Sequence, residues 1–155
     1  MQLTPNFGLA EVWCHQSTPN EVQTRTAYLL ARLILQPLRD YINEPIRITS
    51  GFRSAPVPGG SATSEHLYIG QSGAIDINIG KPTPARNLHA YNWLAQNCLY
   101  SIGQLIYYAE TTHLHISLAG KHQGQLLVCR SKAGHDYVAI KRSSEIQRYD
   151  PRLSA

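Results

Sequence analysis

Two short segments of alternating apolar and polar residues place the strongest limits on how this chain can fold. In residues 74–79 every second residue is isoleucine, and Asp76 lies among the residues between them. In residues 113–118 every second residue is leucine or isoleucine, and His113 and His115 lie on the other side. A period of two predicts half-buried β-strands. The fold must therefore contain a sheet with one apolar face and one face that carries a carboxylate and imidazoles.

Helix signals precede each part of the predicted sheet. Thr18-Pro19-Asn20-Glu21 predicts an N-cap at Thr18, proline at the first helical position and a capping box. A buried stripe at helical spacing then follows: Ala27, Leu30, Ala31, Ile34 and Leu38. Pro37 predicts an interruption near the end of this helix. Thr83-Pro84 predicts a second helix that continues to about Tyr100.

The remaining segments complete the prediction of the fold class. Further strands are expected at four places, residues 46–49, 104–108, 126–130 and 137–141, and the strand pair around residue 110 is expected to be antiparallel. Residues 51–73 are rich in glycine, proline and serine, which predicts a long loop, and a loop of this length is usually functional or mobile. This order favours an α+β fold in which helices pack on a small, mainly antiparallel sheet. We expect one domain over residues 1–155, because a chain of this length can bury a core of its own.

Composition and charge narrow the classes of partner. The formal charge of +4 favours polyanions, but the basic residues are scattered and form no nucleic-acid-binding motif, so we expect no nucleic acid partner. No apolar run reaches membrane-spanning length, and the first thirteen residues lack the pattern of a secretory signal. The three cysteines form no C-x-x-C pair, which argues against a cysteine-only metal site. We expect a monomer that does not insert into membranes.

His66, Asp76 and His115 are the candidate metal ligands. Asp76 and His115 come from the polar faces of the two predicted strands, and His66 lies in the loop just upstream. Two histidines and one carboxylate, with a fourth position left open, suit a catalytic zinc ion. The alternative is a surface histidine, a histidine bonded to backbone and a solvated aspartate, because scattered polar residues on an exposed strand face are ordinary.

An ordered set of motifs resembles one known family. These motifs are SGFRS (50–54), GGS (59–61), SEHL (64–67), GAIDI (73–77) and HLHIS (113–117). The set is similar to the signature of the zinc D-alanyl-D-alanine carboxypeptidases, including their phage-type and endopeptidase relatives. The resemblance covers residues 3 to about 120.

The resemblance implies a site and a substrate. His66, Asp76 and His115 would be zinc ligands, Arg53 would hold a substrate carboxylate or carbonyl, and Ser64 would lie beside the substrate. The implied reaction is zinc-dependent hydrolysis of amide bonds in peptidoglycan stem peptides that contain D-amino acids. The implied enzyme is a carboxypeptidase or an endopeptidase, for example a phage lysin. It would be cytoplasmic until release to the cell wall, or virion-associated.

Two departures from the family pattern affect the chemistry. The histidine and aspartate ligands lie ten residues apart in place of the family's seven. The usual position of the catalytic acid is occupied by Thr112, which cannot act as a general base near neutral pH. Glu110 and His113 are the candidate catalytic residues that remain, although either could be a solvated surface residue. Arg53 is the third catalytic candidate, because Arg53 or His113 would help to hold the oxyanion. A zinc-binding relative with impaired catalysis, which binds cell wall or serves as a virion component, is the first alternative function. A basic nucleic-acid-binding protein is the second, and the order of the motifs argues against it.

Overall fold

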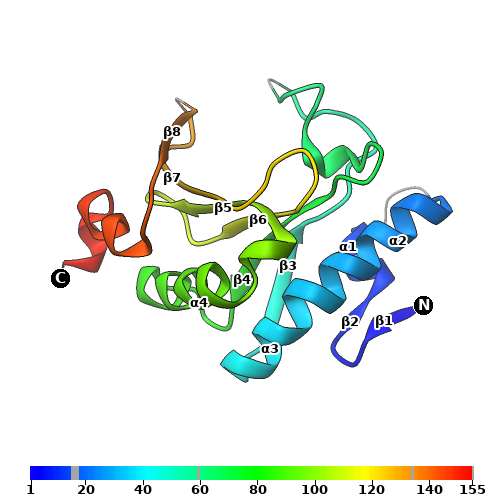
Figure 1. The fold of residues 1–155 in the computed structure, drawn as a ribbon, viewed down its shortest axis with the longest axis horizontal. Helices are drawn as coiled ribbons and strands as arrows, with labels where there is room; N and C mark the ends of the chain where they lie inside the picture. Colours follow the sequence, from blue (N-terminus) through cyan, green and yellow to red (C-terminus); the bar gives the residue numbers. More distant parts are fainter. Residues whose placement is uncertain (15–17, 59, 134, 155) are drawn as a thin grey trace.

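A computed structural model describes residues 1–14, 18–58, 60–133 and 135–154, and it has an α+β fold (Figure 1). The α-helices are α1 (Leu9–Trp13), α2 (Glu21–Leu30), α3 (Gln36–Ile42) and α4 (Pro84–Asn97). The strands are β1 (Gln2–Thr4), β2 (Phe7–Gly8), β3 (Ile46–Ser50), β4 (Ala74–Ile79), β5 (Ile102–Tyr108), β6 (Leu114–Leu118), β7 (Gln125–Ser131) and β8 (Asp136–Ala139). Short 3₁₀ turns include η2 (Glu65–Leu67), η3 (Leu99–Ser101), η4 (Ser143–Arg148) and η5 (Pro151–Leu153).

The main sheet has six strands in the order β3-β4-β6-β5-β7-β8. All neighbouring pairs are antiparallel except β5 and β7, which are parallel, so the prediction of a mainly antiparallel sheet is confirmed. The register places Asp76 of β4 directly opposite His115 of β6. Directly opposed residues share one face of a sheet, so this register brings two of the predicted ligands together.

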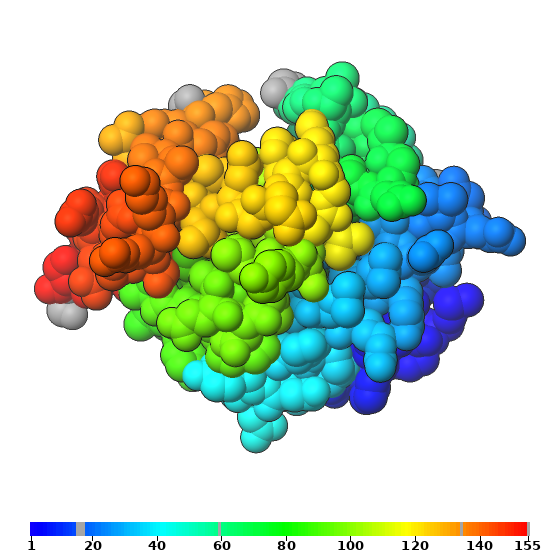
Figure 2. Space-filling view, in the orientation of Figure 1, coloured from blue at the N-terminus to red at the C-terminus, as the bar shows by residue number. Residues whose placement is uncertain are grey.

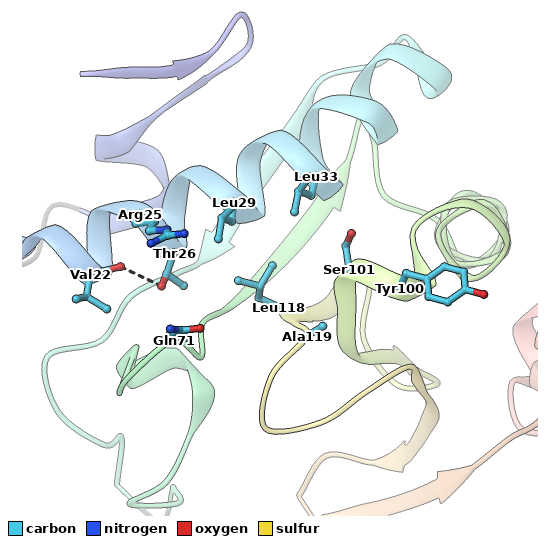
Figure 3. Close-up of a pocket in the computed structure, with 10 residues that line it drawn as sticks. All are labelled: Val22, Arg25, Thr26, Leu29, Leu33, Gln71, Tyr100, Ser101, Leu118 and Ala119. Carbon is cyan, nitrogen blue, oxygen red and sulfur yellow. Dashed lines mark hydrogen bonds between the residues drawn. The ribbon is translucent and has the colours of Figure 1, made fainter.

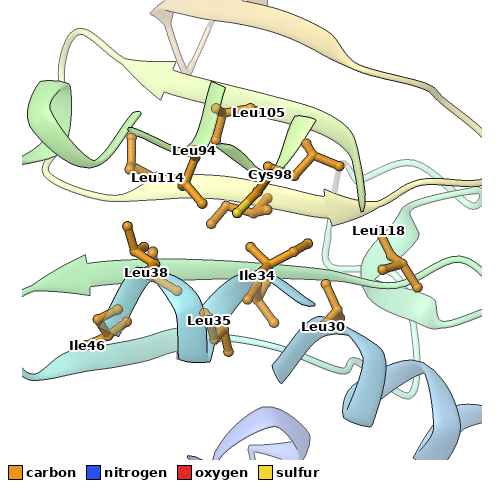
Figure 4. Close-up of a cluster of buried hydrophobic side chains, with 14 of the residues drawn as sticks. Leu30, Ile34, Leu35, Leu38, Ile46, Leu94, Cys98, Leu105, Leu114 and Leu118 are labelled. Carbon is orange, nitrogen blue, oxygen red and sulfur yellow. The ribbon is translucent and has the colours of Figure 1, made fainter. Parts of the chain in front are cut away.

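One face of the sheet packs on the helices and forms the core. The predicted stripe of the first helix is fully buried, and its leucines and isoleucine face Leu105, Leu114 and Leu118 of the sheet (Figure 4). Helix α4 covers the same face beside it (Figure 1). The opposite face carries the 51–73 segment and the β7–β8 hairpin, which rise above it (Figure 1). The helical layer therefore covers the apolar face of the sheet and leaves the other face for a functional site.

The ends of the helices differ in part from the prediction. Helix α2 is capped by Asn20 and not by Thr18, because the Asn20 side chain accepts from the Gln23 amide while the Gln23 side chain accepts from the Asn20 amide. The predicted interruption is a π-helical turn (Ala31–Leu35) that joins α2 to α3 just before Pro37. Thr83 caps α4 as predicted, but that helix ends at Asn97, where η3 follows.

Three elements at the N-terminus were not predicted. Strands β1 and β2 form a small separate hairpin, and α1 follows directly. These elements are too short for their periodicity to be recognised. Gly59 of the GGS motif lies outside the described residues. Among the residues that the structure describes, no helix has the length and apolar character needed to cross a membrane.

Candidate metal centre

Three predicted ligands meet on the open face of the sheet. Asp76 and His115 come from neighbouring strands, and His66 is brought over them by η2. His115 Nδ1 lies 2.9 Å from Asp76 Oδ1, and His66 Nε2 lies 3.3 Å from His115 Nδ1 and 3.5 Å from Asp76 Oδ1. All three residues are almost completely buried. The structure therefore brings the three predicted ligands together in one cluster.

The separations fit a tetrahedral ion. Zinc–nitrogen and zinc–oxygen bonds of about 2.0–2.2 Å place tetrahedral ligand atoms about 3.3–3.5 Å apart. Two of the observed separations, 3.3 and 3.5 Å, lie in this range, and the third is shorter at 2.9 Å. Two imidazoles and one carboxylate are also the ligand set of several catalytic zinc sites. The three residues could therefore hold a metal ion and leave one position for water or substrate.

The orientation of His66 is set by the backbone of the SGFRS motif. His66 Nδ1 lies 2.8 Å from the carbonyl oxygen of Gly51, so Nδ1 carries the proton and Nε2 keeps its lone pair toward the cluster. The Arg53 amide donates to the His66 carbonyl at 2.8 Å, which ties the two segments together. A Cβ atom at Gly51 would collide with the Val12 carbonyl oxygen of α1, so only glycine allows this approach.

Asp76 is held in its charged form. Burial by itself would raise the pKa of this carboxyl group, but the hydrogen bonds and charges of His115 and His66 outweigh burial and hold the pKa far below its ordinary value. An ionised carboxylate is the form that binds a cation.

The longer spacing between His66 and Asp76 is absorbed by an outward turn. Tyr68 and Gly70 adopt left-handed backbone conformations, with φ of 49° and 65°. Ile69 between them is 62% exposed, whereas the Tyr68 ring is buried edge-on against Trp13 and Phe52. The extra residues therefore bulge into solvent, and both ligands keep their places.

The two predicted substrate-binding residues lie next to the ligands. Arg53 Nη2 donates to Ser50 Oγ at 2.9 Å and lies 3.7 Å from Asp76 Oδ2, and its side chain is 28% exposed. Ser64 caps η2, where its hydroxyl oxygen accepts from the His66 amide at 3.4 Å. Arg53 can thus reach a bound molecule, while the observed contact of Ser64 orients the turn that carries His66.

The two candidate catalytic residues lie in or beside the turn between β5 and β6. The exposed carboxylate of Glu110 accepts from the Lys132 amide at 3.1 Å. His113 lies one residue before β6, with Nδ1 2.9 Å from Thr111 Oγ1 and its ring 4.3 Å from the Tyr108 ring. Burial lowers the pKa of His113. Sequence reasoning missed Tyr108, although its place on the polar face of β5 follows from the same period of two.

The surface above the open face is hollowed. Figure 2 shows a notch between the β7–β8 hairpin, in orange, and the segment around residues 60–70, in green. Lys132 belongs to this hairpin, and its Nζ lies 5.8 Å from the centre of the Tyr108 ring. The polar face of the sheet therefore lies between two walls, one that supplies His66 and one that supplies Lys132.

Another cavity, of about 310 Å³, lies away from the ligands (Figure 3). It opens between α2 and the residues around η3, and Arg25 is the charged residue in its lining. Its other lining residues include Leu29, Leu33, Leu118 and Tyr100. None of the predicted site residues lines it, so this cavity is separate from the candidate metal centre.

Comparison with known proteins agrees with this geometry. Residues 5–117 match the peptidase M15 family, and this range contains all three candidate ligands, Arg53, Ser64, Glu110 and His113. Searches of curated proteins and of solved structures gave no match. Because the match covers most of the chain and includes the buried His-Asp-His cluster, the chain belongs to the peptidase M15 family of metallopeptidases.

Proposed function

We propose that this protein is a zinc-dependent hydrolase of amide bonds in peptidoglycan stem peptides, either a D-alanyl-D-alanine carboxypeptidase or an endopeptidase. The observation that carries the proposal is the cluster of His66, Asp76 and His115, at separations close to tetrahedral, with Arg53 beside it. Such a cluster provides both a metal site and a fixed positive group for a substrate anion.

The residues of the cluster and those beside it would have different binding roles. A zinc ion held by the three ligands would supply a nucleophile from water near neutral pH and polarise the scissile carbonyl. Arg53 would bind a carboxylate or carbonyl of the substrate through the N–H groups that it does not share with Ser50. Ser64 would line the same side, next to the turn that carries His66.

Residues in and beside the β5–β6 turn would carry out the proton transfers. Thr111 engages Nδ1 of His113, so Nε2 is the nitrogen that would exchange a proton with the reacting groups or stabilise the developing oxyanion. Burial lowers the pKa of His113 and so favours the neutral form, which can accept a proton. Glu110 would act as base after its carboxylate leaves the Lys132 amide.

A second function is favoured by one specific observation. The usual acid position holds Thr112, and the nearest carboxylate, Glu110, is exposed and already hydrogen-bonded to the β7–β8 hairpin. A relative that has lost its base would keep the metal cluster and bind cell wall, or serve as a virion component, without cleaving it. Under either function we propose a monomer that acts on the wall after release or from a virion. The net positive charge favours this anionic surface.

A digest of purified peptidoglycan separates the two functions. The zinc-loaded protein would be incubated with walls of several cross-link types, with and without a chelator, and the products identified by mass spectrometry. Chelator-sensitive release of D-alanine indicates a carboxypeptidase, and cut cross-bridge peptides indicate an endopeptidase. No product from folded, zinc-loaded protein would refute the hydrolase and support the binding relative.

A further inference from the structure

We propose that Arg152 is a positioning residue for catalysis, because its guanidinium group fixes the turn that carries Glu110 and leads to His113. This inference rests on the proposed hydrolase function. Arg152 lies in η5, 35 residues beyond the last residue of the family match, so the family pattern does not include it.

Arg152 is anchored by a buried carboxylate. Asp150 has no exposed surface, and it accepts hydrogen bonds from Tyr107 Oη at 2.6 Å and from the Arg152 side chain at 2.7 and 2.8 Å. The Arg152 amide donates to the same carboxylate at 3.0 Å. Because Tyr107 belongs to β5, these bonds tie the C-terminal segment to the strand that enters the β5–β6 turn.

The other side of the Arg152 guanidinium contacts the turn itself. Nη2 donates to the carbonyl oxygens of Tyr108 and Thr111, and Nη1 also donates to Thr111, each at 3.2 Å. Tyr108 is the last residue of β5, and Thr111 lies three residues later. A single planar group thus holds both ends of the four-residue segment that contains Glu110.

The two residues held in this way both contact His113. Thr111 Oγ1 lies 2.9 Å from His113 Nδ1, and the Tyr108 ring packs against the His113 ring at 4.3 Å. The backbone of each partner is therefore fixed by Arg152, and the side chain of each partner fixes the imidazole. A small displacement of a catalytic group can lower a rate about 100-fold, so such a support affects turnover directly.

The geometry requires arginine and not only a positive charge. Its planar group presents five N–H donors, which here serve the Asp150 carboxylate on one side and two carbonyl oxygens on the other. Lysine at position 152 would keep a charge beside Asp150 but has one nitrogen, which cannot span these acceptors. Arg152→Lys therefore keeps a positive charge beside Asp150, which supports the fold, but loses hydrogen bonds that hold the β5–β6 turn.

The test compares R152K and R152A with R148A, which removes the exposed Arg148 of the same segment. For each zinc-loaded protein, kcat and KM would be measured on the wall peptide that the wild type cleaves. The His113 ring signals would be followed by NMR, and amide hydrogen exchange over residues 109–113 would be measured. These last two readouts need no activity. We expect R152K to stay folded with one zinc ion, to lower kcat about 10–100-fold with KM nearly unchanged, and to shift the His113 signals.

The outcomes separate this inference from the proposed function. Wild-type kcat and wild-type His113 signals in R152K would overturn the positioning role, as would a change in KM alone. An equal loss in R148A would also overturn it. If the wild type cleaves no wall peptide, the proposed hydrolase fails, and the His113 signals and the exchange rates still decide whether Arg152 fixes the turn. If R152A does not fold, R152K decides.

Discussion

Two buried aspartates with opposite kinds of surroundings organise this molecule. Asp76 and Asp150 are 8% and 0% exposed, and in both cases hydrogen bonds outweigh burial and lower the pKa of the carboxyl group. Asp150 receives four hydrogen bonds from a phenol, a guanidinium group and a backbone amide, all between 2.6 and 3.0 Å. Asp76 is instead shared by two imidazoles, with Arg53 at 3.7 Å.

The difference lies in what each carboxylate can still bind. The Asp150 oxygens are saturated by hydrogen bonds from groups that keep their protons at neutral pH, so the cluster is structural. The imidazoles around Asp76 can give up their protons and present nitrogen lone pairs, so the same cluster can accept a divalent cation. A buried carboxylate is therefore a candidate metal ligand only when its partners are also potential ligands.

The largest effect is expected from Asp76→Asn. An amide is a poor zinc ligand, so zinc affinity and hydrolysis should each fall by more than the roughly 10–100-fold that is typical when an outer partner of a ligand is lost. Equilibrium dialysis with metal analysis measures the first, and the wall digest the second. Asp150→Asn is the control and should keep one zinc ion per chain. Unchanged zinc affinity in D76N would remove this residue from the ligand set.

The next effect concerns the stability of the apoprotein. Asp150→Asn removes the charge that Arg152 and Tyr107 bond, and it should lower the free energy of unfolding by about 3 kcal/mol. Asp136→Asn is the matched control: its pair with Arg130 is exposed on both sides, so its loss should lower the free energy of unfolding far less. Urea unfolding of the three proteins measures both differences. Equal losses in the two variants would mean that burial does not distinguish the pairs.

The same variant gives a pH-dependent prediction. Because the pKa of Asp150 is lower in the folded state than the ordinary value of about 3.9, its contribution to stability is present above that value and is lost as the pH falls through the folded-state pKa. The difference in unfolding free energy between wild type and D150N should thus stay constant from about pH 5 to 8 and shrink below about pH 4. A difference that grows on acidification would contradict the lowered pKa.

The smallest effect is expected from Tyr107→Phe. It deletes one hydrogen bond to Asp150 while the Arg152 bonds remain, and a loss of about 1 kcal/mol in unfolding free energy is expected. Tyr91→Phe is the control, because the Tyr91 hydroxyl makes long contacts of 3.4 Å to the backbone oxygens of Leu105 and Leu127. Tyr91→Phe should lower the free energy of unfolding by less than Tyr107→Phe. Thermal unfolding of both variants would show whether this difference is found.

Much of the ligand cluster could be predicted because strand periodicity is a local property. The alternation in β4 and β6 assigned Asp76 and His115 to the polar face before the pairing of the strands was known. His66 came from the motif order and from its glycine-rich surroundings. The roles of Arg53, Ser64, Glu110 and His113 stay predictions, since they depend on a bound substrate.

The parts of the fold that the sequence did not predict correctly have several causes. Thr18 and Asn20 are both good N-cap residues, and the choice between them depends on which side chain can reach an amide two or three positions later. The π-helical turn before Pro37 depends on how the helix packs on the sheet, which no spacing rule specifies. The N-terminal hairpin and α1 are too short to have a period.

By itself, the sequence determined the polar and apolar faces of the strands, the start of α4 and the three side chains able to bind a metal, because each depends on residue type and near neighbours. The tertiary structure alone decided three other features. It placed His66 against the Gly51 carbonyl, turned the extra loop residues outward, and brought Arg152 against the turn beside His113. The contact of His66 with Gly51 joins residues 15 positions apart, and that of Arg152 with Thr111 joins residues 41 positions apart. Only packing of the whole chain, and no local pattern, can select them.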